Sequence, residues 1–152
     1  MTRRRHDAHS GDLFASIPKP AAAEPGGMDF RTRIAVLVSE MLDDARAADP
    51  ELDRYAVAAR VSRLVGKEVS KAMLDAYTAE SRDAYNVPAW LMPALEHVCH
   101  SHRYSEWLAQ IRGGRFLLGP AALDAEIGRV QGEMDGLREQ LRGLQEVRRR
   151  LR

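Results

Sequence analysis

The sequence predicts an all-α protein, in which a small helical bundle is followed by a long C-terminal coiled-coil helix. Three observations predict this fold class. The composition is 45% hydrophobic but only 6% aromatic, with abundant Ala, Leu, Arg and Glu, which favours helices over sheets. Apolar residues recur at helical spacing between residues 30 and 111, and at 3.5-residue spacing after residue 120. A chain of 152 residues can therefore supply one modest core and an appended rod.

Residues 1–27 are predicted to form a disordered N-terminal arm. Its Pro, Ala and Gly content cannot bury enough apolar surface to offset the entropy of ordering. Leu13 and Phe14 form a candidate docking motif within it, because nothing in the arm itself would bury two large apolar side chains. Residues 10–14 resemble the end of the short peptides that bind the bacterial sliding clamp, without their leading glutamine. This implies a replication protein as a partner, and the alternative is an arm folded back on its own domain.

Residues 28–119 are predicted to form the helical domain, which opens with a helix of about four turns. Asp29 is placed to cap this helix. Apolar residues from Phe30 to Ala45 recur on one face, and Pro50 ends the helix because it cannot continue the hydrogen-bond ladder.

The next two helices are separated by a very short turn. Asp53 can accept the free amide hydrogens of a second helix, which runs to Gly66 as its left-handed terminator. Ser70 then caps a third helix, which fades near Ser81. Two short helices joined by such a turn form the layout in which the second helix enters the major groove of DNA.

Two more helices are predicted before the rod. Pro88 or Pro93 opens a fourth helix, so either a single turn precedes Pro93 or the helix is kinked there. A fifth helix is expected to begin at Ser105 and to stop at Gly113. Residues 115–118 are too few for a further element, and an extended piece that packs on the core is one interpretation.

The segment from Arg54 to Tyr77 resembles the repressor-like helix-turn-helix family. Val69 and Leu74 fall where that family places inward apolar residues after the turn. Gly66 departs from the pattern, because it precedes Val69 by three positions and makes the turn about two residues longer. The resemblance implies that the ligand is double-stranded DNA.

The groove-facing side of the third helix would present few groups that can read bases. Ser70 and Lys71 can reach a phosphate or a guanine edge, whereas Asp75 repels the backbone and can only accept from cytosine. Nearby cations would supply phosphate contacts that set the register without specifying sequence. The alternative is a purely architectural helical hairpin. The predicted DNA-contacting residues are Arg54, Arg60, Arg63, Lys67, Ser70, Lys71, Asp75 and Arg82.

Residues 120–152 carry a heptad repeat that only Arg148 interrupts with a polar side chain. Such a seam is buried only against another helix, so we expect a homo-oligomer, with a dimer preferred. The alternatives are a rod that docks on a helical partner and a rod folded back on its own domain. The terminal basic run 148–152 either touches phosphates or complements the helix C-terminus. The predicted oligomerisation residues are Leu123, Ile127, Val130, Met134, Leu137, Leu141, Leu144 and Leu151.

No pattern in the sequence indicates catalysis, and no cofactor is expected. The chain lacks a phosphate loop, a glycine-rich fingerprint after a strand, and a nucleophile beside a base. One cluster contains residue types that bind metals, namely His97, Cys99, His100 and His102. Helical spacing points Cys99 toward the core, away from His97 and His100, so we expect no metal site.

Composition also bears on location and on the two tryptophans. The net charge is +1, the one cysteine fits a reducing cytosol, and no apolar run approaches the length of a membrane span. We therefore expect a soluble cytoplasmic protein. Trp90 and Trp107 each sit within an apolar helical pattern, which predicts core or interface aromatics rather than base-stacking platforms.

Three phrases, at residues 9–14, 55–81 and 106–114, followed by the helical tail, resemble small proteins of Mu-like transposable phages and prophages. That family is described as DNA-binding or regulatory, so the resemblance implies a bacterial cytoplasm and a phage context. The expected function is regulation of transcription or transposition by an oligomer that binds duplex DNA. The alternative is a non-enzymatic adaptor that docks on phage or host replication or transposition proteins without contacting DNA.

Overall fold

The computed structural model describes residues 18–22, 24–82 and 84–151. All regular secondary structure within these ranges is helical, which confirms the all-α class and the long C-terminal helix. The chain divides into two units between Phe116 and Leu117. The predicted docking motif, Leu13 and Phe14, lies outside the described residues.

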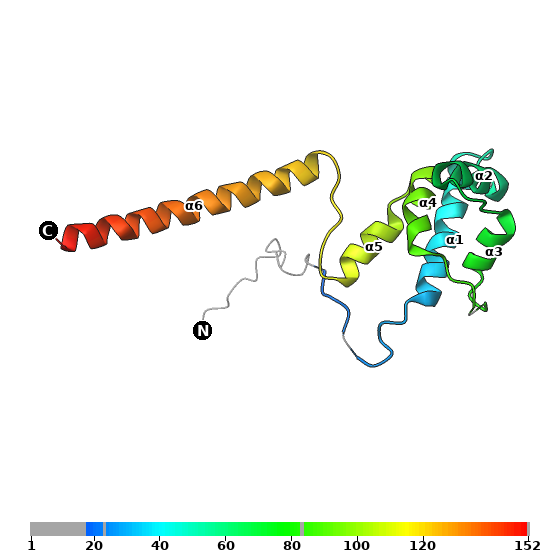
Figure 1. The fold of residues 1–152 in the computed structure, drawn as a ribbon, viewed down its shortest axis with the longest axis horizontal. Helices are drawn as coiled ribbons and strands as arrows, with labels where there is room; N and C mark the ends of the chain where they lie inside the picture. The colour runs from blue at the N-terminus through cyan, green and yellow to red at the C-terminus, as the bar shows by residue number, and fades with distance from the viewer. Residues whose placement is uncertain (1–17, 23, 83, 152) are drawn as a thin grey trace, which may run out of the picture. The chain divides into compact units, whose positions relative to one another are not determined.

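The first unit is a bundle of five short helices. Helix α1 packs against α3 and α5, and α2 packs against α3 and α4 (Figure 1). Their shared core contains Met41, Val57, Leu74 and Leu95, all fully buried. The bounds are α1 Arg31–Ala48, α2 Arg54–Val65, α3 Lys71–Thr78, the 3-10 turn η1 Ala89–Leu91, α4 Met92–Val98 and α5 Arg103–Ile111.

The start of α1 differs from the prediction in its cap, because Phe30 is the N-cap residue and forms no side-chain cap hydrogen bond. Asp29 lies two residues before the helix, and its carboxylate accepts a hydrogen bond from the Arg31 amide at 3.2 Å. The helix ends at Ala48, two residues before Pro50. A carboxylate beside the free amides of a first turn stabilises a helix.

The chain from Pro88 to α5 shows where the fourth and fifth helices begin. A single 3-10 turn precedes Pro93, which then lies in the first turn of α4. The prediction that α5 begins at Ser105 is wrong, because Ser105 is already in its first turn. The amide and hydroxyl of Ser105 donate to the buried carboxylate of Glu96, at 2.9 and 2.6 Å. Ser101 accepts instead from the first amide of the helix, that of Arg103.

The two tryptophans have different environments. Trp107 packs edge-on against Phe30, with ring centroids 5.2 Å apart, and against Tyr104, as an interface aromatic should. Trp90 is 50% exposed, so it is not a core residue, and its role as an interface aromatic stays a prediction. It belongs to η1, a single turn that follows Pro88, and its ring lies beneath the Lys67 ammonium at 4.8 Å.

Part of the predicted arm contacts the bundle. The Ala21 amide donates to the Ile111 carbonyl at 2.8 Å, at the end of α5. Gly113 follows with a φ of +77°, and a Cβ there would lie 3.0 Å from Pro20. Because a larger residue at 113 would meet this segment, the glycine permits the close approach. After α5 the chain has no regular structure at 115–118, where the ring of Phe116 lies 5.4 Å from that of His102 between centroids.

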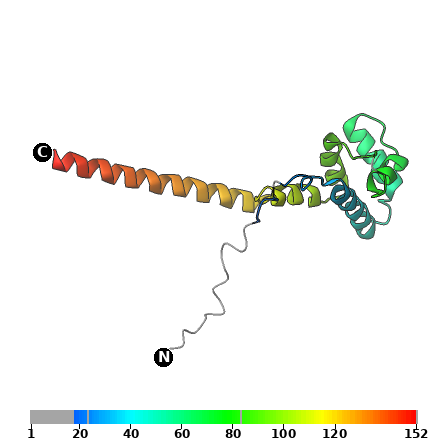
Figure 2. The same ribbon diagram turned by 90° about the horizontal axis from the view of Figure 1, so that it is seen from below.

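The second unit consists of α6, Pro120–Arg150, which begins at the predicted proline. It is one uninterrupted helix of 31 residues (Figure 2). Its heptad side chains are between 42% and 82% exposed, and none of its described residues is buried. Among the described residues, no helix is long and apolar enough to cross a membrane.

Candidate nucleic-acid interface

The α2–turn–α3 unit is held by caps at three points that the sequence predicts. The Asp53 carboxylate accepts from the Ala56 amide at 2.8 Å at the start of α2. Gly66 ends α2 with a φ of +64°, in the left-handed region. The Ser70 hydroxyl accepts from the Met73 amide at 3.2 Å at the start of α3. The caps fix where each helix begins and ends, and so set the length of the turn.

Ser62 stabilises the turn between α2 and α3 through two hydrogen bonds to its backbone. Its hydroxyl accepts from the Val69 amide at 2.8 Å and donates to the Val69 carbonyl at 3.0 Å. The side chain of Val69 is buried, so these two bonds satisfy backbone groups that water cannot easily reach. The sequence gives only one weak signal of this role, a serine near the end of a helix that faces the following turn.

The carboxylate of Asp75 accepts hydrogen bonds from two cations near the start of α3. Lys71 donates to it at 2.5 Å and Arg54 at 2.9 Å, while Arg54 also donates to Thr78 at 2.9 Å. The hydrogen bond from Lys71 lowers the pKa of Asp75, and the same bond raises the pKa of Lys71. The two predicted phosphate contacts are therefore already engaged within the protein.

The predicted DNA-contacting residues do not form one surface. Ser62 and Tyr55 face α3, since Ser62 bonds Val69 and the Lys71 ammonium lies 5.7 Å from the Tyr55 ring. With about 100° between successive residues of a helix, Arg60 points roughly 160° away from Ser62 around α2. Arg60 and Arg63 thus lie on the flank of α2 that faces α4.

A groove of about 240 Å³ lies along that second flank, between α2 and α4. Within the described part of the chain, neither Arg60 nor Arg63 forms an ion pair with a carboxylate. His100 has a φ of +49°, which turns the chain at the end of α4 beside the two arginines. Sequence reasoning missed both histidines, because only the packing of α4 on α2 brings them here. The groove is lined by Arg60, Arg63, Leu64, His97, Val98 and His100.

The two remaining predicted cations lie over aromatic rings. Lys67 is 4.8 Å from the ring centre of Trp90, and Arg82 is 5.9 Å from that of Tyr85. At exposed sites these cation–π contacts are weak, so they leave the charges available to a phosphate.

The histidine and cysteine cluster separates in space. His97 and His100 are exposed along the groove, whereas the Cys99 side chain is buried. Burial raises the pKa of the Cys99 thiol to about 11, so the thiol stays protonated at neutral pH. Among the described residues, no three His, Cys, Asp or Glu side chains are grouped as a metal would require.

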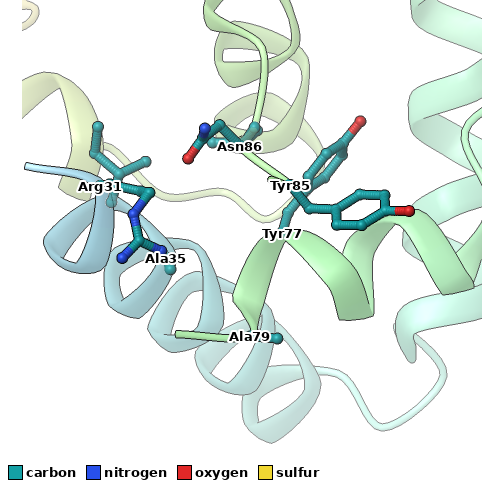
Figure 3. A pocket seen from close by; sticks show the side chains of 8 residues that line it. Arg31, Ala35, Tyr77, Ala79, Tyr85 and Asn86 are labelled. Carbon is teal, nitrogen blue, oxygen red and sulfur yellow. The ribbon is translucent and has the colours of Figure 1, made fainter. Parts of the chain in front are cut away.

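A pocket of about 260 Å³ lies between α1, α3 and the loop that follows α3 (Figure 3). Arg31 donates from its guanidinium to the Glu80 carbonyl at 3.2 Å beside this pocket. The lining can donate hydrogen bonds and pack against a ring, but it places no carboxylate or histidine beside a nucleophile. Its residues are Arg31, Ile34, Ala35, Tyr77, Ala79, Tyr85, Asn86 and Val87.

We compared the chain with known protein families, curated proteins and solved structures. No protein family, curated protein or solved structure matches the chain.

Proposed function

We propose that this chain binds duplex DNA as an oligomer and regulates transcription or transposition in a phage or prophage, within the bacterial cytoplasm. The observation that carries the proposal is the α2–turn–α3 unit, in which caps at both helix starts and the Ser62 bonds hold a second helix whose first turn is partly exposed. This is the layout that presents a recognition helix to the major groove.

Affinity in this proposal comes from the backbone of DNA rather than from the bases. Arg60 and Arg63 supply two guanidinium groups that form no ion pair within 4.0 Å in the described part of the chain. Each phosphate they engage releases counterions from the duplex. At the start of α3, Asp75 competes with DNA for Lys71, so base readout by one domain is weak.

Salt dependence of duplex binding tests the proposal. Affinity measured between about 50 and 200 mM salt should fall steeply for the full-length protein, since several phosphates are engaged. The double change Arg60→Ala with Arg63→Ala should weaken binding and flatten the salt slope by about two units. Lys71→Ala should have a smaller effect, because Asp75 already holds this ammonium.

A matched control separates the site from bulk charge. Arg33→Ala with Arg112→Ala removes the same charge elsewhere on the first unit, so it should leave the slope close to that of the unchanged protein. Equal losses in the two double variants would show that only net charge matters. Binding that survives loss of Arg60 and Arg63 would place the contact surface elsewhere.

A protein-interaction adaptor is the second candidate, and one observation favours it. Leu64 is 54% exposed between the two arginines of the groove. An apolar side chain flanked by cations fits an acidic amphipathic segment of another protein, such as a replication or transposition protein. Absence of duplex binding even at about 50 mM salt would favour this function over DNA contact.

A further inference from the structure

We propose that α6 pairs with α6 of a second copy in antiparallel orientation, which attaches the two helical bundles at opposite ends of the shared rod. This inference rests on the oligomer in the proposed function, and it adds the partner's direction. It does not depend on whether the bundle contacts DNA.

The exposed seam of α6 requires a partner of its own length. The eight large apolar side chains of the seam between Leu123 and Leu151 are exposed, from 42% for Val130 to 82% for Leu151. They follow the steps of four and three that another helix can cover along the whole length. An apolar stripe of this extent along one face of a helix marks an interaction surface.

Charge along α6 is strongly asymmetric, and this asymmetry sets the direction. Residues 120–139 carry five acidic side chains and two arginines, whereas residues 140–151 carry four arginines and one glutamate. A parallel partner would place acidic beside acidic and basic beside basic. An antiparallel partner places the acidic half of each helix beside the basic half of the other, which is the complementary arrangement.

Arg148 occupies a seam position and gives the same direction. In a parallel, in-register pair, Arg148 would face Arg148 of the partner across the seam, next to Arg149 and Arg150 of both helices. In an antiparallel pair it faces Leu123 of the partner near a helix end, where its guanidinium reaches water and the partner's Asp124 and Glu126. Only the second arrangement avoids stacking like charges at a seam.

In antiparallel register the central seam keeps its apolar contacts, whereas Leu123 faces Arg148 near each end and Leu151 lies opposite Pro120. When Met134 lies opposite Leu137, each layer joins an a position of one helix to a d position of the other. The flanking positions then bring no like charges together. The layers pair Ile127 with Leu144, Val130 with Leu141, Met134 with Leu137 and Leu123 with Arg148.

A parallel pair would allow one favourable ion pair between the helices. Both of its side chains already form ion pairs within their own helix. Glu133 would face Arg138 of the partner across the parallel interface. Glu133 is bonded to Arg129 four residues earlier, and Arg138 is bonded to Asp135 at 2.7 Å. Forming the interhelical pair would therefore exchange existing contacts rather than add one.

The direction has a consequence for the bundles. The first residues of the two α6 helices would lie about 45 Å apart along the rod, the length of the helix itself.

Distances between spin labels on full-length protein test the direction. Ala125 and Glu146 lie at f positions, away from the seam, and an antiparallel pair brings Ala125 of one helix level with Glu146 of the other. In a Cys99→Ala background, Ala125→Cys labelled on both chains should give an axial separation of about 30 Å, and so should Glu146→Cys. A mixture of the two labelled proteins should add a short distance at equal height.

The experiment distinguishes failure of the antiparallel direction from failure of the oligomer itself. Short distances within each single variant, with about 30 Å only in the mixture, would show a parallel pair and overturn this inference while the oligomer stands. A monomeric mass at micromolar concentration would overturn both the pairing and the oligomer. Circular dichroism of each variant checks that α6 is retained, since both substitutions are at exposed positions.

Discussion

Asp75 illustrates how one side chain decides what a surface offers to a ligand. Read along the sequence, Lys71 and Arg54 are two cations near the start of a recognition helix. In the structure both donate to the same carboxylate, at 2.5 and 2.9 Å. The lowered pKa of Asp75 means that these bonds add stability above its usual value of 3.8, and that this stability is lost as the pH falls through the lowered pKa.

Replacing Asp75 should therefore improve DNA binding. Asp75→Asn removes the carboxylate that holds Lys71 and Arg54, so both cations become available to phosphates. Duplex affinity should rise, and the salt slope should steepen by about one to two units. Fluorescence anisotropy with a labelled duplex measures both quantities.

Glu139→Gln supplies the control for this prediction. It removes one negative charge from the exposed face of α6 and should change the slope little. If Asp75→Asn behaves like the control, α3 does not approach DNA.

At the scale of an element, the turn between α2 and α3 depends on a single hydroxyl. Ser62 bonds both backbone groups of Val69, and Val69 is buried. Ser62→Ala leaves these groups unsatisfied at the place where the angle between the helices is set. The free energy of unfolding should fall by about 1–3 kcal/mol, measured by urea denaturation.

Ser39→Ala is the matched control, because the Ser39 hydroxyl donates only to an exposed carboxylate, that of Asp43, at 3.4 Å. Its effect should stay within about 0.5 kcal/mol. Equal stability of the two variants would contradict the role assigned to Ser62.

The helix ends show which predictions from local sequence agree with the folded structure. The caps at Asp53 and Ser70 and the terminator at Gly66 are confirmed, because each acts through its own neighbouring backbone. The start of α5 is not where the sequence predicts it. Ser105 has the chemistry of a cap, but the buried carboxylate of Glu96 takes its amide and hydroxyl, and only the approach of α4 to α5 provides that acceptor.

At the scale of the whole molecule, the rod should decide the oligomeric state. A chain ending at Gly119 loses the whole exposed seam, so its mass in solution should be that of a monomer, whereas the full chain should be a dimer. Light scattering of the two proteins at matched concentration gives the comparison. A dimer that persists without α6 would move the interface to the bundle.

The same truncation should affect long and short DNA differently. A single bundle binds a short duplex through its own contacts, so affinity for about 15 base pairs should change little. Affinity for long DNA, where both bundles of the dimer can engage, should fall by on the order of 10²-fold. Equal losses on both substrates would indicate that the two bundles act on one short site.

The sequence by itself determined the features that depend on local chemistry and periodicity. Helical spacing predicted the all-α fold, the caps placed α2 and α3, and the heptad placed α6. These follow from contacts within a few residues along the chain, so no packing is needed to read them.

Tertiary packing decided what the surfaces present. It joined Arg54 and Lys71 to Asp75, separated them from Arg60 and Arg63 on the other flank of α2, and brought His97 and His100 beside those arginines. Trp90 lies outside the core for the same reason. Contacts between side chains distant in sequence depend on how helices pack, and one helix's periodicity says which face is buried but not which neighbour it meets.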